Sequence, residues 1–266
     1  MTNFYTLASG SSGNALLLSC GDIHLLIDAG ISLRRIKTSL KELSLRMEDL
    51  SAILITHTHS DHTAALATTV RHHGVPIFAS AAAARELQYR VQNITPLLRP
   101  FDIGCELNFG SCRVRTFATA HDAPGSVCYR IDTPDGSFGV LTDSGFVTPE
   151  AEALLPGVDL LVLEANHDVE TLLSGDYPYF LKDRILSSRG HLSNETAAEF
   201  AVKAARAGTK EIVLAHLSRE NNTPAMAYNT VWQALSCCGC TAALSVAPRD
   251  TMSECYKVEG SCVCRK

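Results

Sequence analysis

Four side chains able to bind a metal ion lie within six residues of one another, directly after an apolar run. The run Ser51-Ala52-Ile53-Leu54-Ile55 predicts a buried strand, and the segment after it reads Thr56-His57-Thr58-His59-Ser60-Asp61-His62. Burying three imidazoles and a carboxylate together without a metal would leave costly unpaired polar groups. Ligands crowded into a tight loop on a rigid strand are typical of a metal site, so this segment predicts a two-metal hydrolase.

Three further apolar runs also lead to a residue that can bind metal. Residues 114–120 precede His121, residues 139–142 precede Asp143, and residues 212–215 precede His216. The candidate ligands then comprise five imidazoles and two carboxylates. This mixture suits zinc, manganese or iron, whereas calcium and magnesium prefer oxygen ligands alone. The choice among the three metals stays open.

The hydrophobic pattern predicts the elements that carry these ligands. Strand-length apolar runs recur at residues 15–19, 23–27, 52–55, 75–79, 114–118, 126–131, 138–141, 160–163, 212–215 and 242–246. Helices are predicted around residues 31–43, over 81–91, and over 193–207, where an N-cap serine precedes the segment and Gly208 follows it. Residues 175–188 show no strand pattern and are interpreted as an inserted helical element.

The order of these elements indicates the fold class. The turn Pro134-Asp135-Gly136 predicts a hairpin, so at least one strand pair is antiparallel, while alternation of strands and helices elsewhere favours parallel pairing. Two sheets packed face to face, with helices outside, would accommodate so many strands in one domain. We therefore expect an α/β protein with mixed sheets, organised as a single domain over residues 1–266.

Composition limits the classes of function. With 46% apolar and 19% charged residues, the 266-residue chain is typical of a globular protein with a large core. A net charge of -5 argues against a surface that binds polyanions everywhere, so any nucleic-acid contact must come from a local patch or from metals. The first residues lack an export signal, and no apolar stretch reaches membrane-spanning length, so we expect a cytoplasmic protein without membrane contact.

Ten cysteines are present, and we expect them to be reduced thiols. Six gather near the C-terminus: Cys237, Cys238, Cys240, Cys255, Cys262 and Cys264. Their spacing lacks the paired C-x-x-C arrangement of structural zinc sites, so no zinc site is predicted there.

The ligand order resembles the metallo-β-lactamase superfamily, whose motifs run His-x-His-x-Asp-His, then a histidine, an aspartate and a histidine. The resemblance spans nearly the whole chain and implies a four-layer αββα sandwich with the site along one edge of the two sheets. It implies one metal held by His57, His59 and His121, a second held by Asp61, His62 and His216, and Asp143 as the bridge. Asp61 is also a candidate catalytic residue.

An additional acid of that superfamily matches Asp28 in Leu25-Leu26-Ile27-Asp28-Ala29-Gly30. A ligating imidazole usually donates its other N–H to such a carboxylate, which fixes the tautomer and the ring orientation. The alternative is that Asp28 is a turn residue before Gly30.

Four segments carry a narrower resemblance, to the YycJ/WalJ/VicX group of bacterial proteins: residues 7–14, 120–126, 163–168 and 190–194. This resemblance implies a 5'-to-3' exonuclease activity on double-stranded DNA. In such a reaction, two divalent cations about 3.5 to 4 Å apart can share a hydroxide that attacks phosphorus. The implied partner is duplex DNA, and the oligomeric state stays open.

Residues near the predicted site edge are candidates for substrate contact. His191 is the candidate for protonating the leaving 3' oxygen or gripping phosphate, because residues 190–193 open a helix whose N–H groups favour an anion. Asn166 and His167 follow a buried strand at the same edge, and Asn14 follows a Gly/Ser loop. The alternatives are that His191 is an exposed histidine in a cap region and that Asn14 is an ordinary turn residue.

Aromatic and basic residues gather just before His191. Tyr177, Tyr179 and Phe180, followed by Lys182, Arg184 and Arg189, can stack a base and hold phosphates, although such residues more often belong to a core or a solvated face. Two other function classes stay open. One is a hydrolase of a thioester, lactone or lactam, and the other is a non-catalytic metal-binding regulatory protein.

Overall fold

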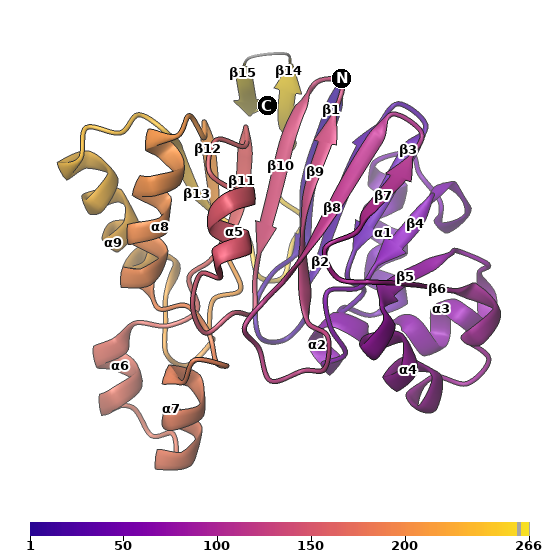
Figure 1. Ribbon diagram of the computed structural model, residues 1–266, viewed down its shortest axis with the longest axis horizontal. Helices are drawn as coiled ribbons and strands as arrows, with labels where there is room; N and C mark the ends of the chain where they lie inside the picture. Colours follow the sequence, from indigo (N-terminus) through magenta and orange to yellow (C-terminus); the bar gives the residue numbers. More distant parts are fainter. Residues whose placement is uncertain (260–261, 266) are drawn as a thin grey trace.

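The structure is a computed structural model that describes residues 1–259 and 262–265, and its strands form two mixed sheets (Figure 1). One sheet has the order β15-β14-β1-β2-β3-β4-β5-β6 and the other β13-β12-β11-β10-β9-β8-β7. The first comprises β1 Thr2–Ala8, β2 Ala15–Cys20, β3 Ile23–Ile27, β4 Ala52–Leu54, β5 Ile77–Ser80, β6 Leu98–Phe101, β14 Tyr256–Glu259 and β15 Cys262–Arg265. The second comprises β7 Glu106–Phe109, β8 Cys112–Ala118, β9 Val127–Thr133, β10 Gly136–Leu141, β11 Leu160–Glu164, β12 Glu211–Ala215 and β13 Ala243–Val246.

Helices cover the outer faces of the two sheets (Figure 1). Those near the first sheet are α1 Leu33–Glu42, α2 Ser60–Thr63, α3 Leu66–His72 and α4 Ala81–Arg90. Those near the second are α5 Pro149–Leu154, α8 Asn194–Arg206 and α9 Pro224–Cys237. Two short helices, α6 Val169–Ser174 and α7 Tyr179–Leu186, lie beyond the ends of the strands, at the lower left of Figure 1. The arrangement is the four-layer αββα sandwich that we expected.

Side-chain alternation along the strands creates the layers. In the first sheet, Leu17, Leu26 and Ile53 point to the outer face and join the apolar cluster that contains Ile36 and Leu40 of α1. Their neighbours along the strands, including Leu16, Leu25 and Leu54, point inward and join the cluster shared with the second sheet. Each strand is therefore buried on both faces, which explains why the runs read as continuously apolar.

Parallel pairing brings the site residues to one edge. Strands β3, β4, β5 and β6 are parallel neighbours, and so are β10, β11, β12 and β13. Parallel strands end at the same edge of a sheet, so residues that follow them gather there. Five such residues do so: Asp28 after β3, His57 after β4, Asp143 after β10, Glu164 at the end of β11 and His216 after β12.

All ten predicted strands are present, with ends shifted by at most two residues, and the predicted hairpin joins β9 to β10. The helix predictions over α1, α4 and α8 are confirmed, and the predicted helical insertion contains α7. Five strands, β1, β6, β7, β14 and β15, and five helices, α2, α3, α5, α6 and α9, were not predicted. The reason is visible in β1, where the polar residues Thr2 and Thr6 are buried and interrupt the apolar pattern. The Thr2 hydroxyl donates to Asp135, and the Thr6 backbone N–H donates to the Ser253 hydroxyl. The single-domain organisation stays a prediction.

Cysteines contribute no metal cluster among the side chains that the structure describes. Cys237 and Cys238 are exposed at the end of α9, and the side chains of Cys262 and Cys264 lie outside the described set. In the described residues, no helix combines the length and the apolar character needed to span a membrane.

Candidate metal centre

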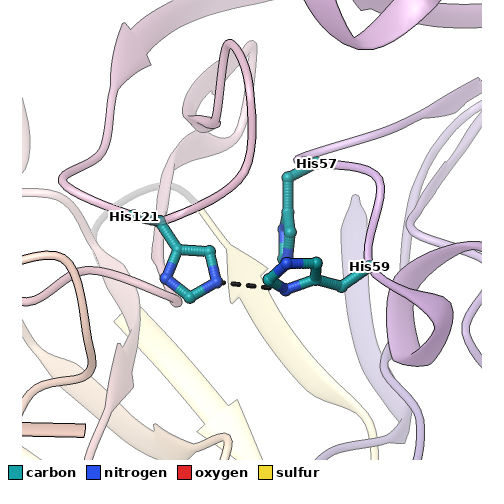
Figure 2. Close-up of side chains that lie close together, drawn as sticks. All are labelled: His57, His59 and His121. Atoms are coloured by element: carbon teal, nitrogen blue, oxygen red, sulfur yellow. Dashed lines mark hydrogen bonds between the residues drawn. The ribbon is translucent and has the colours of Figure 1, made fainter. Parts of the chain in front are cut away.

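Six of the seven predicted ligands form two clusters, and the seventh, Asp143, groups with His57 and His62 from both of them. The ligand atoms of His57, His59 and His121 lie within 4.8 Å of one another, and so do those of Asp61, His62 and His216. Figure 2 shows the first cluster, in which His57 and His59 extend from the loop after β4 and His121 from the loop after β8. The two sheets therefore contribute to one site.

The first cluster has the features of a site built for a cation. His121 Nε2 lies 3.3 Å from His59 Nδ1, and these nitrogens face each other. His57 Nε2 is buried and has no hydrogen-bond partner among the described residues, while its Nδ1 lies 3.0 Å from the Thr56 hydroxyl. A buried polar atom without a partner is costly unless something else binds it. The donor set fits a divalent metal ion.

Asp143 lies between the two clusters. Its Oδ2 is 3.2 Å from His62 Nε2, and its Oδ1 is 3.5 Å from His216 Nε2 and 3.8 Å from His121 Nε2. The carboxylate is buried, and its Oδ2 makes no hydrogen bond of normal geometry. This position between both imidazole sets fits the bridging role that the resemblance implied.

Asp28 occupies the position expected of an outer acid. Its Oδ2 is 2.7 Å from His62 Nδ1, and its carboxylate accepts from the backbone N–H of Thr56 at 2.8 Å and from the Thr56 hydroxyl at 2.8 Å. His62 thereby presents Nε2 toward Asp61 and Asp143. This arrangement fixes the imidazole tautomer, as expected for a residue that supports a ligand.

Glu164 is a residue of the site that the sequence reasoning did not single out. Its Oε1 lies 2.8 Å from His191 Nδ1 and 3.0 Å from His216 Nδ1, while its Oε2 accepts from the backbone of Ser144 and Leu192. The side chain is fully buried at the end of β11. A charged residue that closes an otherwise apolar strand was the available signal, because such a group needs partners.

Three site residues have left-handed backbone conformations. Asp28, Asp143 and His216 have φ values of 61°, 56° and 56°, and each comes shortly after the strand that carries it. Non-glycine residues adopt this conformation at a cost of about 1 to 3 kcal/mol, and such residues cluster at functional sites. The reversal after each strand turns the side chain toward the shared edge of the sheets.

Charges in the site shift several pKa values. Burial works to raise the pKa of Asp143, but the neighbouring His216 and His62 hold it well below its usual range. Burial works to lower the pKa of His216, yet Asp143, Asp61 and Glu164 together raise it to about 10. Burial also lowers the pKa of His57, which has no close carboxylate to oppose it beyond Asp143. The lowered pKa of Asp143 keeps this carboxylate ionised, as a metal ligand must be.

A polar cleft of about 320 Å³ opens onto the centre. Its walls include the candidate ligands His59, Asp61, His121, Asp143 and His216, together with His191 and Asn166. A larger hollow of about 740 Å³ lies between α1 and α3 and contains none of the predicted ligands. We regard the smaller cleft as the functional one, because the metal-binding groups and their shifted pKa values lie there.

Comparison with known proteins agrees with this geometry. A family model described as the β-lactamase superfamily domain matches residues 24–217. The chain belongs to this family. A crystal structure of YhfI from Bacillus subtilis, a metallo-β-lactamase fold protein, matches with a TM-score of 0.72 at 19% identity, covering 95% of this chain and 98% of that one.

Two curated relatives cover most of the chain. Exodeoxyribonuclease WalJ from Streptococcus pneumoniae is 40% identical over 228 residues, which is 85% of each chain. Exodeoxyribonuclease YycJ from Bacillus anthracis is 36% identical over 234 residues, which is 88% of this chain and 89% of the relative. The YycJ/WalJ resemblance inferred from the four short segments is therefore confirmed.

The four residues predicted to contact substrate in this β-lactamase superfamily chain differ in whether they line the cleft. Asn166 lines the cleft and donates to the His216 carbonyl at 2.9 Å. His167 does not line it: only 1% of His167 is exposed, because consecutive residues of extended backbone face opposite ways. Asn14 is buried against the ligands, with its Nδ2 3.1 Å from His62 Nε2.

His191 lines the cleft. Helix α8 begins at Asn194 and is capped by Ser193, which accepts from the N–H of Thr196. The His191 ring turns toward Glu164, and its Nδ1 lies 3.6 Å from Asp143 Oδ1. The role of the helix N-terminus as an anion site beside His191 stays a prediction.

The aromatic and basic residues that precede His191 lie partly in the cleft and partly on the surface. Tyr177, Arg184 and Arg189 line the cleft, whereas Tyr179 and Phe180 are 83% and 74% exposed on α7. Lys182 donates to the carbonyls of Leu173 and Gly175 within the same segment. The alternative that these aromatics belong to the core is therefore wrong.

Proposed function

We propose that this chain is a two-metal exonuclease that removes nucleotides from the 5' ends of double-stranded DNA. The observation that carries the proposal is the 40% identity to an exodeoxyribonuclease over 85% of the chain. The convergence of all seven candidate ligands supports it. The polarity, the duplex preference, the number of metals and their identity among zinc, manganese and iron are parts of the proposal, as is a cytoplasmic location.

The proposed division of ligands follows the clusters. His57, His59 and His121 would hold one cation, Asp61, His62 and His216 the other, and Asp143 would contact both. Two such cations would activate water and neutralise charge on the scissile phosphate. Asp61, which is partly exposed to the cleft, would also orient the reacting water through the carboxylate oxygen not turned toward His62 and His216.

His191 is the proposed acid for the leaving 3' oxygen. Glu164 engages its Nδ1, so Nε2 is the ring nitrogen available to substrate. The side chain is 20% exposed and lines the cleft. A histidine within reach of the leaving group and oriented by a buried carboxylate has the arrangement of a general acid. Asn166 would contact the phosphate beside it.

The proposal is tested with purified protein, manganese and linear duplex DNA labelled at one end. We expect release of mononucleotides from the 5' end, and loss of release in His59→Ala and Asp143→Ala. Asp132→Asn is the control, because Asp132 pairs with Arg115 on the strands β8 and β9 rather than in the cleft. Matched RNA duplexes and a set of thioester and lactone substrates complete the panel.

Three results would count against the proposal. Full activity in both ligand variants would exclude the two-metal mechanism. Preference for thioesters or lactones would support a small-molecule hydrolase, and two bound metals with no activity on any substrate would support a regulatory protein. For His191→Ala we expect reduced turnover with both metals retained, and loss of a metal would instead identify His191 as a ligand.

A further inference from the structure

Four of the five imidazoles of the proposed centre have a hydrogen-bond partner for the ring nitrogen that would face away from the cations. For His57 the partner is Thr56, for His62 it is Asp28, for His121 it is the Gly190 carbonyl, and for His216 it is Glu164. These partners fix the tautomers of the ligands. His59 is the remaining imidazole, and its Nδ1 faces His121 Nε2, so its Nε2 needs an acceptor.

The residue beside His59 Nε2 is Asp122, in the loop after β8. Its Oδ1 lies 3.4 Å from His59 Nε2 and 3.5 Å from His121 Nε2. That oxygen is buried and has no hydrogen bond of normal geometry to any described residue. A small approach of the His59 ring, with Nε2 protonated, would give Asp122 Oδ1 its missing donor.

The other oxygen of Asp122 is bound to the wall of the cleft. Arg184 Nε donates to Oδ2 at 2.7 Å, and Arg184 Nη2 lies 2.6 Å from the same oxygen. Arg184 belongs to α7, a helix in which no residue is buried. Within the described residues, the Lys182 side chain of α7 bonds only to the α6–α7 segment itself. The Arg184 side chain instead connects α7 to the loop that carries Asp122. Asp122 therefore joins a candidate metal ligand to a weakly anchored helix.

We propose that Asp122 is a positioning residue that holds the His59 imidazole for the first cation and, through Arg184, fixes α7 relative to that cation. The inference rests on the proposed metal centre. Since Tyr177, Leu181 and Ile185 line the cleft from this segment, the same contact sets the shape of the wall that substrate meets. Disturbing α7 then weakens the first cation site, although α7 contributes no ligand.

The test measures zinc affinity by chelator competition, with Asp122→Asn, Arg184→Met, the double variant and Asp132→Asn as the matched control. Asp132, like Asp122, pairs with an arginine, but it lies on β9 away from the cleft. We expect one zinc ion to bind about ten- to a hundred-fold more weakly in Asp122→Asn, which is the usual effect of losing a ligand's partner. Arg184→Met should weaken the same ion less, and the double variant should match Asp122→Asn because the two residues act in series.

NMR of the zinc-loaded protein provides a readout that does not depend on activity. A slowly exchanging Nε2–H signal of His59 should be present in the wild type and in Asp132→Asn, and lost in Asp122→Asn. The metal-free variants should melt at the wild-type temperature, which excludes a general folding defect.

Each contrary result has one meaning. Unchanged zinc affinity and an intact His59 signal in Asp122→Asn would overturn the positioning role. Complete loss of one zinc ion would make Asp122 a ligand, and additive effects in the double variant would overturn the link to α7. If the wild type bound no zinc or manganese at all, the metal centre itself would be refuted, which is a separate failure from the previous three.

Discussion

Glu164 shows how one buried carboxylate can set the chemistry of two neighbouring histidines. The same oxygen accepts from His191 and His216, so the proposed acid and a candidate ligand are oriented together. Burial works to raise the pKa of Glu164, but His191 and His216 lower it to about 2. The carboxylate therefore stays ionised across the working pH range and keeps both rings fixed.

Replacing Glu164 by glutamine should reduce turnover by about ten- to a hundred-fold, because the isosteric amide has a weaker acceptor for the two imidazoles. Steady-state exonuclease assays measure this, and metal content should be checked in parallel. Glu152→Gln is the control, since Glu152 forms a half-exposed pair with Lys203 on the surface. Wild-type turnover in Glu164→Gln would show that the contact does not orient His191.

At the scale of elements, the turn between β3 and α1 determines how the metal loop packs. A Cβ atom on Gly30 would lie 1.6 Å from the Asp61 carbonyl oxygen and 2.7 Å from the Asn14 nitrogen. The absence of a side chain at Gly30 lets three backbone segments meet there, with hydrogen bonds from Asn14 to Asp61 and from Gly30 to Asn14.

Gly30→Ala should therefore destabilise the fold by about 3 kcal/mol and displace Asp61 from the site, because the clash is with backbone that cannot move aside. Urea unfolding measures the loss of stability, and zinc titration reports the displacement of Asp61. Gly74→Ala is the control, since no atom lies within 4 Å of the added Cβ there. Equal stability of the two variants would contradict this account of the turn.

Asp159 fixes the opposite ends of the strands, away from the centre. It accepts from the Ser137 backbone at 2.8 Å and from Lys210 at 2.7 Å, which ties the starts of β10 and β12 together. Burial works to raise its pKa, but Lys210 and Ser137 lower it below the usual 3.8. Because the pKa of Asp159 is lower in the folded state, its contribution to stability is present at a pH above the ordinary pKa of the unfolded chain. The contribution is lost as the pH falls through the lower pKa of the folded state.

Asp159→Asn should cost about 1 kcal/mol of unfolding free energy near neutral pH, after allowance for partial solvent screening. The difference from wild type should shrink as the pH falls below the ordinary pKa of 3.8 and through the lower pKa of the folded state, because the wild-type carboxylate then becomes protonated. Urea unfolding at several pH values measures it. A difference that stays constant with pH would mean that the charge of Asp159 does not contribute.

At the scale of the whole molecule, the centre joins the two sheets. His57 and His62 belong to the first sheet's edge, whereas Asp143 and His216 belong to the second, so bound cations would cross-link them. Without cations, the cluster holds ionised and buried groups close together, which is costly.

Removing metal with a chelator should lower the unfolding temperature, and adding zinc or manganese back should restore it. A cation held at about a thousand times its dissociation constant would stabilise the native state by about 4 kcal/mol. Calorimetry with and without chelator measures the shift, and Asp143→Ala should reduce it because the bridging group is lost. A melting temperature independent of metal would show that the cations do not join the sheets.

The local sequence indicated the candidate ligands and most of the strands, because the loop at His57 to His62 and the apolar runs are contiguous in the chain. Residue type alone indicated a divalent metal, and ligand order indicated the superfamily. Strand β1 was not predicted, because the buried residues Thr2 and Thr6 interrupt its apolar pattern. The partners of the Thr2 hydroxyl and the Thr6 backbone N–H are distant in sequence.

Only the tertiary structure decided which groups meet at the strand ends. Glu164 contacts His216 and Asp122 contacts Arg184, and both partners lie on other segments of the chain. Residue spacing along the sequence does not predict such contacts. His167 and Asn166 are adjacent in sequence, yet only Asn166 reaches the cleft, because extended backbone sends neighbouring side chains to opposite sides. The local sequence determines which side chains could bind a metal, whereas the direction in which each side chain points depends on packing between distant segments.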